Sequence, residues 1–254
     1  MLAVFKREFK SYFTNPLGFI ILAVVYFFLG YMFSGYYSAG APYVQYVVIA
    51  VAQILLFVIP VITMRLFSDE HRQKTDQVLF TAPVKLINIV LGKFFAAFAL
   101  YAIGFAPTIV YQIIVSSYVS VNLFYYIYSI VGILLFGAAL IALGMFISSL
   151  TESPIISIVF TLIVNIFIML ASSFANAITV PTVSSSNAIM KFLGTIWAWL
   201  VKAFASFING FDFIGTLESF GNQTFAVKDV IFFISVACAF IFLTERSLEK
   251  RRWS

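Results

Sequence analysis

The segment FSDEHRQKTDQVLFTAPVKL, residues 67–86, lies between two long apolar runs. Its titratable side chains are Asp69, Glu70, His71, Arg72, Lys74, Asp76 and Lys85. Because an ionised side chain costs about 2.5 to 3.5 kcal/mol at the centre of a bilayer, these residues must lie outside the hydrocarbon. The segment therefore predicts a loop in water between two membrane-spanning helices.

The composition of the whole chain indicates an all-α membrane protein. Of its 254 residues, 63% are hydrophobic and 10% are charged, and the mean hydropathy is +1.06. In soluble proteins about a quarter of the residues are charged. The net charge of +5 comes from basic residues beside apolar runs, without a nucleic-acid-binding motif. It therefore indicates membrane topology rather than a nucleic-acid partner.

Six segments are long enough to cross a hydrocarbon core of about 30 Å, which needs about 20 residues of helix. They are residues 17–37, 43–66, 87–119, 123–150, 154–175 and 229–244, the last of which begins a few residues earlier, near residue 226. Residues 17–254 are thus expected to form a single transmembrane domain.

Residues 1–16 are expected to form a separate amphipathic helix. Leu2, Phe5 and Phe9 share one helical face, and basic residues surround the other. This pattern favours a helix that lies in the membrane interface. The alternative is a solvated basic segment that only orients the first span.

Lys and Arg residues are distributed unequally over the two sides of this topology. If the N-terminus is cytoplasmic, twelve of the fifteen lie on the cytoplasmic side, and only Lys191, Lys202 and Lys228 lie on the other. The bias predicts that both termini and residues 67–86 are cytoplasmic. Residues 176–225 are then extracellular. A seventh span there would carry the basic C-terminus outside, so we expect helices that lie on, or re-enter, the outer leaflet.

Catalytic motifs are missing from the sequence. It contains neither GxxxxGK[ST] nor HExxH, and the single histidine, His71, has no second metal ligand nearby in the sequence. The serines around residue 150 have no histidine partner for nucleophilic catalysis. We expect no enzymatic activity, metal or cofactor in this chain.

Gln53, Gln112 and Asn165 are the chief polar side chains inside the expected spans. A side-chain amide in hydrocarbon needs a partner, so each should face protein or a cavity. They form either a substrate path or ordinary hydrogen bonds between helices, and the sequence leaves both interpretations open.

Residues 67–86 also predict a short helix. Ser68 can cap its N-terminus, Asp69 and Glu70 lie near the positive end of the helix dipole, and Pro83 ends it. A charged helix between two spans is well placed to receive force from a soluble partner. The alternative is an ordinary solvated loop.

This segment resembles the membrane subunits of ABC-2 type ABC transporters, and most closely the permease of the gliding-motility type. The positions that carry the resemblance are Phe67, Glu70, Thr75, Leu79 and Pro83, followed by Gly92 and Lys93. Three further segments are similar to that subfamily: FDFIGTLESF at 211–220, VKDVIFFISVACAFIFLTERSLEKRRW at 227–253, and the loop at 148–152.

The resemblance implies a type V exporter-like fold, with an N-terminal interfacial helix, six spans, a cytoplasmic coupling helix and extracellular re-entrant helices. It assigns Glu70, Arg72, Thr75, Gln77 and Leu79 to the coupling helix, and Thr151 and Glu152 to a second cytoplasmic contact. It also implies a second permease chain and two copies of a separate ATP-binding subunit, which hold ATP and magnesium. One departure concerns that contact, because the family commonly has GTxE where this chain has Lys74-Thr75-Asp76-Gln77.

The sequence thus predicts the permease subunit of an ATP-driven exporter in the bacterial cytoplasmic membrane, in contact with lipids and with room for an auxiliary subunit. An ABC complex that transmits force or a signal without moving a solute is the alternative. A transporter driven by an ion gradient is disfavoured, because Glu152, Asp229 and Glu245 lie at the ends of spans.

Overall fold

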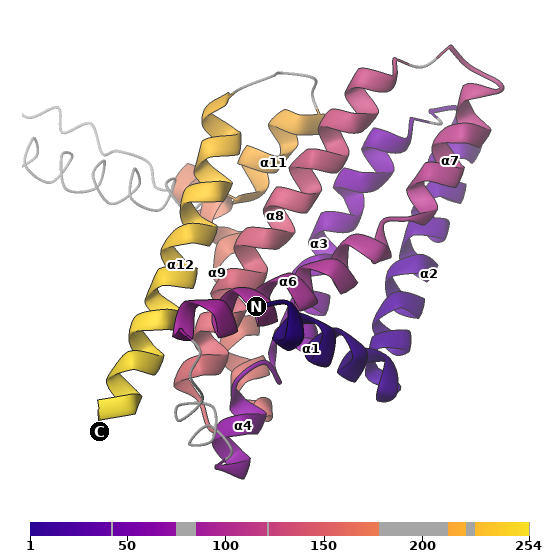
Figure 1. Ribbon diagram of the computed structural model, residues 1–254. Coiled ribbons are helices and arrows are strands. Elements are labelled where there is room, and N and C mark those ends of the chain that lie inside the picture. Colours follow the sequence, from indigo (N-terminus) through magenta and orange to yellow (C-terminus); the bar gives the residue numbers. More distant parts are fainter. Residues whose placement is uncertain (42, 75–84, 121, 178–212, 222–226, 254) are drawn as a thin grey trace, which may run out of the picture.

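The computed structural model describes residues 1–41, 43–74, 85–120, 122–177, 213–221 and 227–253. The elements within these ranges are all helices (Figure 1). They are α1 (Leu2–Thr14), α2 (Leu17–Ser38), α3 (Val44–Thr63), α4 (Ser68–Gln73), α6 (Leu86–Gly104), α7 (Pro107–Ser116), α8 (Leu123–Leu150), α9 (Pro154–Ala177), α11 (Phe213–Gly221) and α12 (Val227–Trp253).

Among the described residues, five helical stretches are long and apolar enough to cross a membrane. They are Leu17–Ser38, Val44–Gln73, Leu86–Ser116, Leu123–Leu150 and Val227–Arg251. The apolar part of α9, Pro154–Leu170, is shorter. The expectation of an all-helical membrane protein is therefore supported, and the count of six spans stays a prediction.

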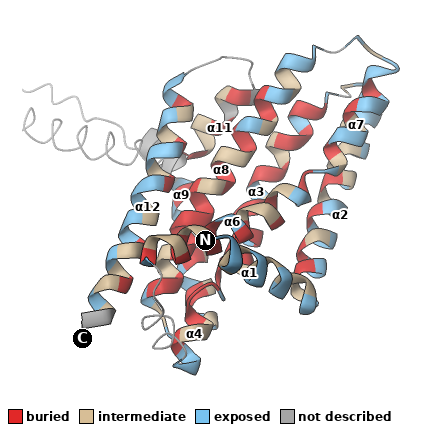
Figure 2. Ribbon diagram, viewed as in Figure 1, coloured by how far each residue is buried: buried red, intermediate tan, exposed pale blue. Residues whose placement is uncertain are grey.

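Helices α3 and α8 lie at the centre of the bundle (Figure 2). Helix α8 packs against α3, α6, α9, α11 and α12, and its Phe136 and Leu140 are fully buried. On α3, Val51 and Leu55 are also fully buried. Helix α2, in contrast, exposes large apolar side chains such as Phe27, as expected of a helix that faces lipid.

The third expected span, residues 87–119, is not one continuous helix. Helix α6 ends at Gly104 and α7 begins at Pro107. Proline has no N–H, and its ring excludes the carbonyl four residues earlier, which here belongs to Ile103. That carbonyl accepts a hydrogen bond from the Tyr26 hydroxyl of α2, at 3.2 Å. The expected span is therefore made of two helices that meet at the proline, and the stretch Leu86–Ser116 is long and apolar enough to cross a membrane.

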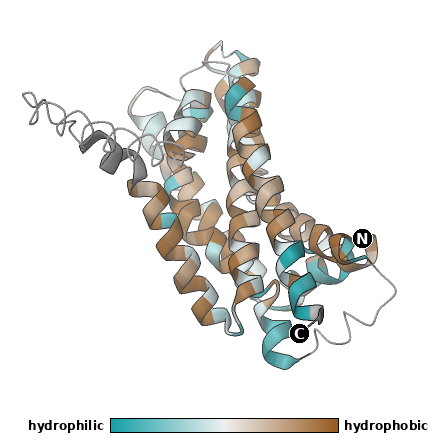
Figure 3. Cartoon of the chain, turned by 90° about the vertical axis from the view of Figure 1, so that its left-hand side faces the viewer, coloured by the Kyte–Doolittle hydropathy of each residue, from teal (hydrophilic) through white to brown (hydrophobic). Residues whose placement is uncertain are grey.

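Helix α1 crosses the end of the bundle at which α4 and the C-terminal end of α12 also lie (Figure 1). It packs against α2 and α6. The expected N-terminal helix is thus present. Figure 3 shows that hydrophilic residues gather around both termini and α4, at this end of the bundle. Its placement in a membrane interface stays a prediction.

Helix α11 is the described part of the expected extracellular segment beyond α9. Its Phe213 and Phe220 are buried, and the Phe220 ring stacks on Tyr128 of α8 with centroids 4.5 Å apart. Gly132 makes room for Phe220, since a Cβ at this glycine would lie 2.5 Å from the Phe220 ring. Helix α11 therefore packs into the bundle rather than lying away from it. The other predictions for residues 178–212 lie outside the described residues.

Candidate coupling site

The residues Met64–Phe67 connect α3 to α4, and we call them the α3–α4 joint. The last carbonyls of a helix have no partner within the helix and need donors from elsewhere. In this structure, side chains from three other helices supply such donors to the end of α3 and to the joint. The joint is therefore held by α1, α6 and α8 together.

Helix α1 contributes Tyr12. Its hydroxyl donates a hydrogen bond to the carbonyl of Ile62, at 2.8 Å, in the last turn of α3. Burial, reinforced by the nearby Glu8 carboxylate, raises the pKa of Tyr12 well above its usual range. Tyr12 therefore stays protonated and continues to act as a donor at physiological pH.

Helix α8 contributes Ser148, which is fully buried. Its Oγ donates to the carbonyl of Met64, at 3.1 Å, and accepts from the backbone amides of Phe67 and Ser68, both at 3.2 Å. A serine hydroxyl has one proton and two lone pairs, so these contacts use its full capacity. Ser148 thus caps the N-terminus of α4 from a different helix.

The predicted cap by Ser68 was wrong. Ser68 is the first residue of α4, and its hydroxyl donates back to the carbonyl of Met64 instead of accepting from an amide of α4. The physical reason is that α4 already begins at Ser68, so Phe67 occupies the N-cap position, from which a side chain could reach the next free amides of the helix.

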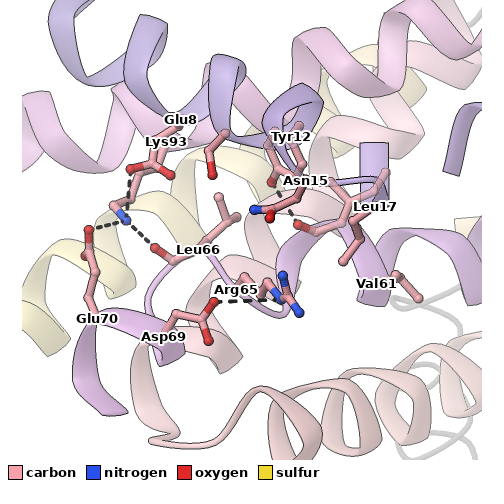
Figure 4. Close-up of a pocket in the computed structure, with 12 residues that line it drawn as sticks. Glu8, Tyr12, Asn15, Leu17, Val61, Arg65, Leu66, Asp69, Glu70 and Lys93 are labelled. Carbon is pink, nitrogen blue, oxygen red and sulfur yellow. Dashed lines mark hydrogen bonds and ion pairs between the residues drawn. The ribbon is translucent and has the colours of Figure 1, made fainter. Parts of the chain in front are cut away.

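Helix α6 contributes Lys93, whose side chain is only 1% exposed (Figure 4). Its ammonium nitrogen lies 2.9 Å from the carboxylate of Glu70 on α4 and 3.6 Å from that of Glu8 on α1. It also donates to the carbonyl of Leu66 and lies 4.7 Å from the centroid of the Phe67 ring. One buried cation thus connects α1, the joint, α4 and α6.

Arg7 joins the same group of charges from α1. Its guanidinium lies 2.6 Å from Glu8 and 3.1 Å from Glu70. The hydrogen bond to Glu8 is the main reason that the pKa of Arg7 is raised. Arg7, Glu8, Glu70 and Lys93 therefore form a network, which we call the Lys93 network. A buried charge is tolerated only when it is paired and hydrogen-bonded in this way.

Gly92 explains how α1 can approach Lys93. A Cβ at this position would lie 2.9 Å from the Cβ of Val4 and 3.1 Å from the carbonyl of Met1. The glycine therefore lets α1 lie directly on α6, which brings Glu8 within reach of the neighbouring Lys93.

Helix α4 is shorter than expected. It ends at Gln73, and Lys74 adopts the left-handed conformation, with φ 54° and ψ 26°, that commonly terminates helices. Arg72 is exposed at its end. The expected site residues Thr75, Gln77, Leu79 and Pro83 lie outside the described residues, so their roles stay predictions.

The second expected contact, Thr151 and Glu152, lies in the turn between α8 and α9. Helix α4 packs against both of these helices. Thr151 is partly buried and donates to the carbonyl of Ile147, at 3.2 Å, whereas Glu152 is exposed. His71 of α4 also contacts Arg251 near the end of α12. The structure thus places α4 beside the α8–α9 turn and the C-terminal helix.

The three amides proposed for a substrate path come from three different helices and differ in burial. Gln53 is exposed on α3, Gln112 is buried on α7, and Asn165 is fully buried on α9. Asn165 donates from Nδ2 to the carbonyl of Leu56, at 2.7 Å. Pro60, four residues after Leu56, has no N–H with which to bond that carbonyl. Asn165 therefore supplies the donor that Pro60 lacks, which is an interhelical hydrogen bond.

Glu8 and Lys93 were not singled out as site residues from the sequence. The available signal was a lysine seven residues inside an otherwise apolar helix, because such a cation needs a buried counter-charge. Glu70 was singled out, but its partners are Arg7 of α1 and Lys93 of α6, 63 residues before it and 23 after it along the chain. No local sequence pattern links residues so far apart.

The chain matches the family model described as ABC-2 family transporter protein over residues 34–244. This match covers most of the sequence, and the chain therefore belongs to that family, as the multi-pass membrane component of an ABC transporter. A comparison with curated proteins gives no significant match. Membership confirms that the chain is a membrane subunit without an ATPase domain and implies an ATP-binding partner subunit.

Proposed function

We propose that the chain is the permease subunit of an ATP-driven exporter of the gliding-motility type. Two permease chains pair with two ATP-binding subunits in the bacterial cytoplasmic membrane, and both termini face the cytoplasm. Two observations support this orientation. The basic residues favour it, and α1, α4 and the C-terminal end of α12 lie at one end of the bundle.

In this proposal α4 is the coupling helix. Its exposed end, around Arg72, contacts the ATP-binding subunit together with residues 75–83, Thr151 and Glu152. ATP binding shifts the bundle between two states only if the partner binds those states unequally. Because α4 is held by Ser148 and by the Lys93 network, a displacement of α4 is passed to α8, α6 and α1.

The observation that carries the proposal is the burial of Lys93 between Glu70 of α4 and Glu8 of α1. Desolvating two charges is costly, and a pair of well-packed apolar residues is often at least as stable. An ion pair at this position is therefore explained better by a requirement to hold α1, α4 and α6 in one defined arrangement than by stability alone.

The test compares Lys93→Met with the matched control Lys85→Met, which changes an exposed lysine just before the same helix. Each permease chain, purified with its ATP-binding subunit in lipid nanodiscs, carries a spin label at the exposed Tyr118. We expect ATP with vanadate to change the distance between the two labels in the wild type and in Lys85→Met. In Lys93→Met the change should be lost while ATP hydrolysis continues.

A full distance change in Lys93→Met would remove the Lys93 network from the coupling mechanism. Transport itself is tested separately. ATP-dependent accumulation of a solute in vesicles supports an exporter, and conformational coupling without such accumulation supports the transmission of force or a signal.

A further inference from the structure

A polar cavity of about 160 Å³ lies beside the α3–α4 joint. It is lined by α1, the first turn of α2, the end of α3, the joint, the start of α4 and Lys93 of α6. Figure 4 shows the charged side chains that face it. Its lining contains three carboxylates, Glu8, Asp69 and Glu70, and two cations, Arg65 and Lys93. The cavity is thus rich in charges of both signs.

An apolar groove of about 410 Å³ runs between α2 and α3. The side chains that line it are Ile20, Ile21, Val24 and Phe28 of α2 and Ile54, Phe57, Val58 and Val61 of α3. Val61 lines both the groove and the polar cavity. Leu17, which lines the cavity, lies one turn before Ile20 and Ile21. The cavity and the groove are therefore consecutive parts of one tract.

The length of this tract fits one leaflet of a bilayer. From Leu17 to Phe28 the α2 helix rises about 16 Å, at about 1.5 Å per residue. This is about half of a hydrocarbon core of about 30 Å. The polar end lies beside α1 and α4, which lie at the end of the bundle where the charged residues gather. A molecule that fills the tract needs a charged head at the membrane surface and an apolar tail about one leaflet long.

The charges specify the head group further. Lys93 is buried and paired with Glu70 and Glu8. Arg65 and Asp69 are more accessible, with side chains 49% and 35% exposed, and their charged groups are 3.7 Å apart. Arg65 offers a forked donor that suits a phosphate, and Asp69 offers an acceptor for an ammonium group. Because the lining has one more carboxylate than cations, a zwitterionic head group fits better than an anionic one.

We propose that this tract binds one molecule of phosphatidylethanolamine from the leaflet next to α1. Its phosphate contacts Arg65, its primary ammonium contacts Asp69, and one acyl chain lies in the groove between α2 and α3. The lipid would then touch the α3–α4 joint directly, and its presence would stabilise the packing of α1 and α2 against that joint. This proposal is independent of the direction of transport.

The test uses the full chain in nanodiscs made of equal parts of phosphatidylethanolamine and phosphatidylglycerol. A trace of one of these lipids carries a photoreactive diazirine on its acyl chain, and mass spectrometry maps the labelled peptides. We expect the ethanolamine probe to label residues 17–28 and 54–61 about tenfold more than the glycerol probe, the discrimination that one charge-assisted hydrogen bond provides.

Two variants separate a specific site from lipid that merely surrounds the protein. Val24→Trp, at a groove position that is 37% exposed, should fill the groove and abolish the preferential labelling. Ile163→Trp, at an exposed position on α9, is its control and should leave the labelling unchanged. Arg65→Gln combined with Asp69→Asn should make labelling by the two probes equal.

Several results would overturn the proposal. Equal labelling of the wild type by both probes would show surrounding lipid only. Unchanged preferential labelling in Val24→Trp would place the lipid elsewhere. Photo-crosslinks from a residue in the groove to a second permease chain would show that another copy of this chain covers the groove.

The melting temperature of each variant in detergent is the folding control for these experiments.

Discussion

The candidate coupling site depends on a few buried polar side chains, each of which contacts specific partners. Lys93 is matched to Glu8 and Glu70, Ser148 to the joint, and Asn165 to the carbonyl that Pro60 leaves without its usual donor. Leaving one of these buried groups without its partner would lower the free energy of unfolding by about 1 to 3 kcal/mol or more. These pairs can therefore be tested singly and together.

The pairing of Lys93 with Glu70 can be measured by a double-mutant cycle. Lys93→Met should destabilise the folded chain by about 3 kcal/mol, because it leaves two carboxylates without their buried cation. In the Lys93→Met background, Glu70→Gln should lower the free energy of unfolding by less than it does in the wild type. The reason is that Glu70 no longer has Lys93 as its partner there. Unfolding of the purified chain by SDS in mixed micelles gives these free energies. Strictly additive losses would show that the two side chains do not interact.

The role of Asn165 predicts a rescue. Asn165→Leu should destabilise the chain by about 1 to 3 kcal/mol, because the Leu56 carbonyl loses its donor inside the bundle. In a Pro60→Ala background the new backbone N–H can bond Leu56, so the same change should cost much less. The same unfolding assay compares the two backgrounds. An equal loss in both would contradict the assignment of Asn165 as the replacement donor.

These residue partners were predictable only in part. The sequence indicates that a polar group inside a span needs a partner, and this holds for Asn165 and its contact with Leu56. It does not indicate which partner, because Asn165 and Leu56 are 109 residues apart. Gln53 lies on an exposed face of α3 in the single chain, so the expectation that it faces protein or a cavity stays a prediction.

At the scale of elements, the candidate site is the place where α1, α6 and α8 all contact the α3–α4 joint. The sequence predicted the charged helix after α3 from its composition. The end of that helix at Lys74 was not predictable, because a left-handed residue at a helix end is usually glycine or asparagine. The sequence does indicate that a new helix begins at Pro107, since proline is common at the first position of a helix. The long apolar run around Pro107 hid this signal.

Capping of α4 by Ser148 predicts a local effect on exchange. Ser148→Ala removes the acceptor for the amides of Phe67 and Ser68, so the start of α4 should open more easily, by about 1 kcal/mol. Hydrogen exchange of peptides that contain α4 should then be about fivefold faster. Ser149→Ala is the matched control, because Ser149 donates within its own helix to Phe146. Similar exchange in both variants would exclude the cap.

The close packing of α1 on α6 predicts that two Gly→Ala substitutions change the stability of the chain in opposite directions. In an open helical position, Gly→Ala stabilises by up to about 1 kcal/mol, and at Gly35 an added methyl group would have no atom within 4 Å. At Gly92 the methyl group would press on Val4, so Gly92→Ala should instead destabilise by about 1 kcal/mol or more. Thermal unfolding measures both, and a cysteine at Val4 should react faster with maleimide in Gly92→Ala. Stabilisation by Gly92→Ala would contradict the close packing of α1.

At the scale of the whole molecule, the chain is a helical bundle with its charged network at one end. Hydropathy and length predicted the bundle, because a membrane imposes both on any helix that spans it. The resemblance to ABC-2 membrane subunits, seen first in residues 67–86, agrees with the family match over residues 34–244. The packing of α1 on Gly92 and the network around Lys93 required the three-dimensional arrangement, because they join segments that are far apart in the sequence.

We propose that α4 faces the cytoplasm and contacts the ATP-binding subunit there. The most direct test places a cysteine at the exposed Arg72 and attaches a photoreactive maleimide to it in inside-out membrane vesicles that contain the whole complex. We predict that an impermeant maleimide reaches this cysteine in inside-out vesicles but not in intact cells, and that illumination crosslinks it to the ATP-binding subunit. Labelling of the cysteine from outside intact cells, with no crosslink to that subunit, would contradict the claim.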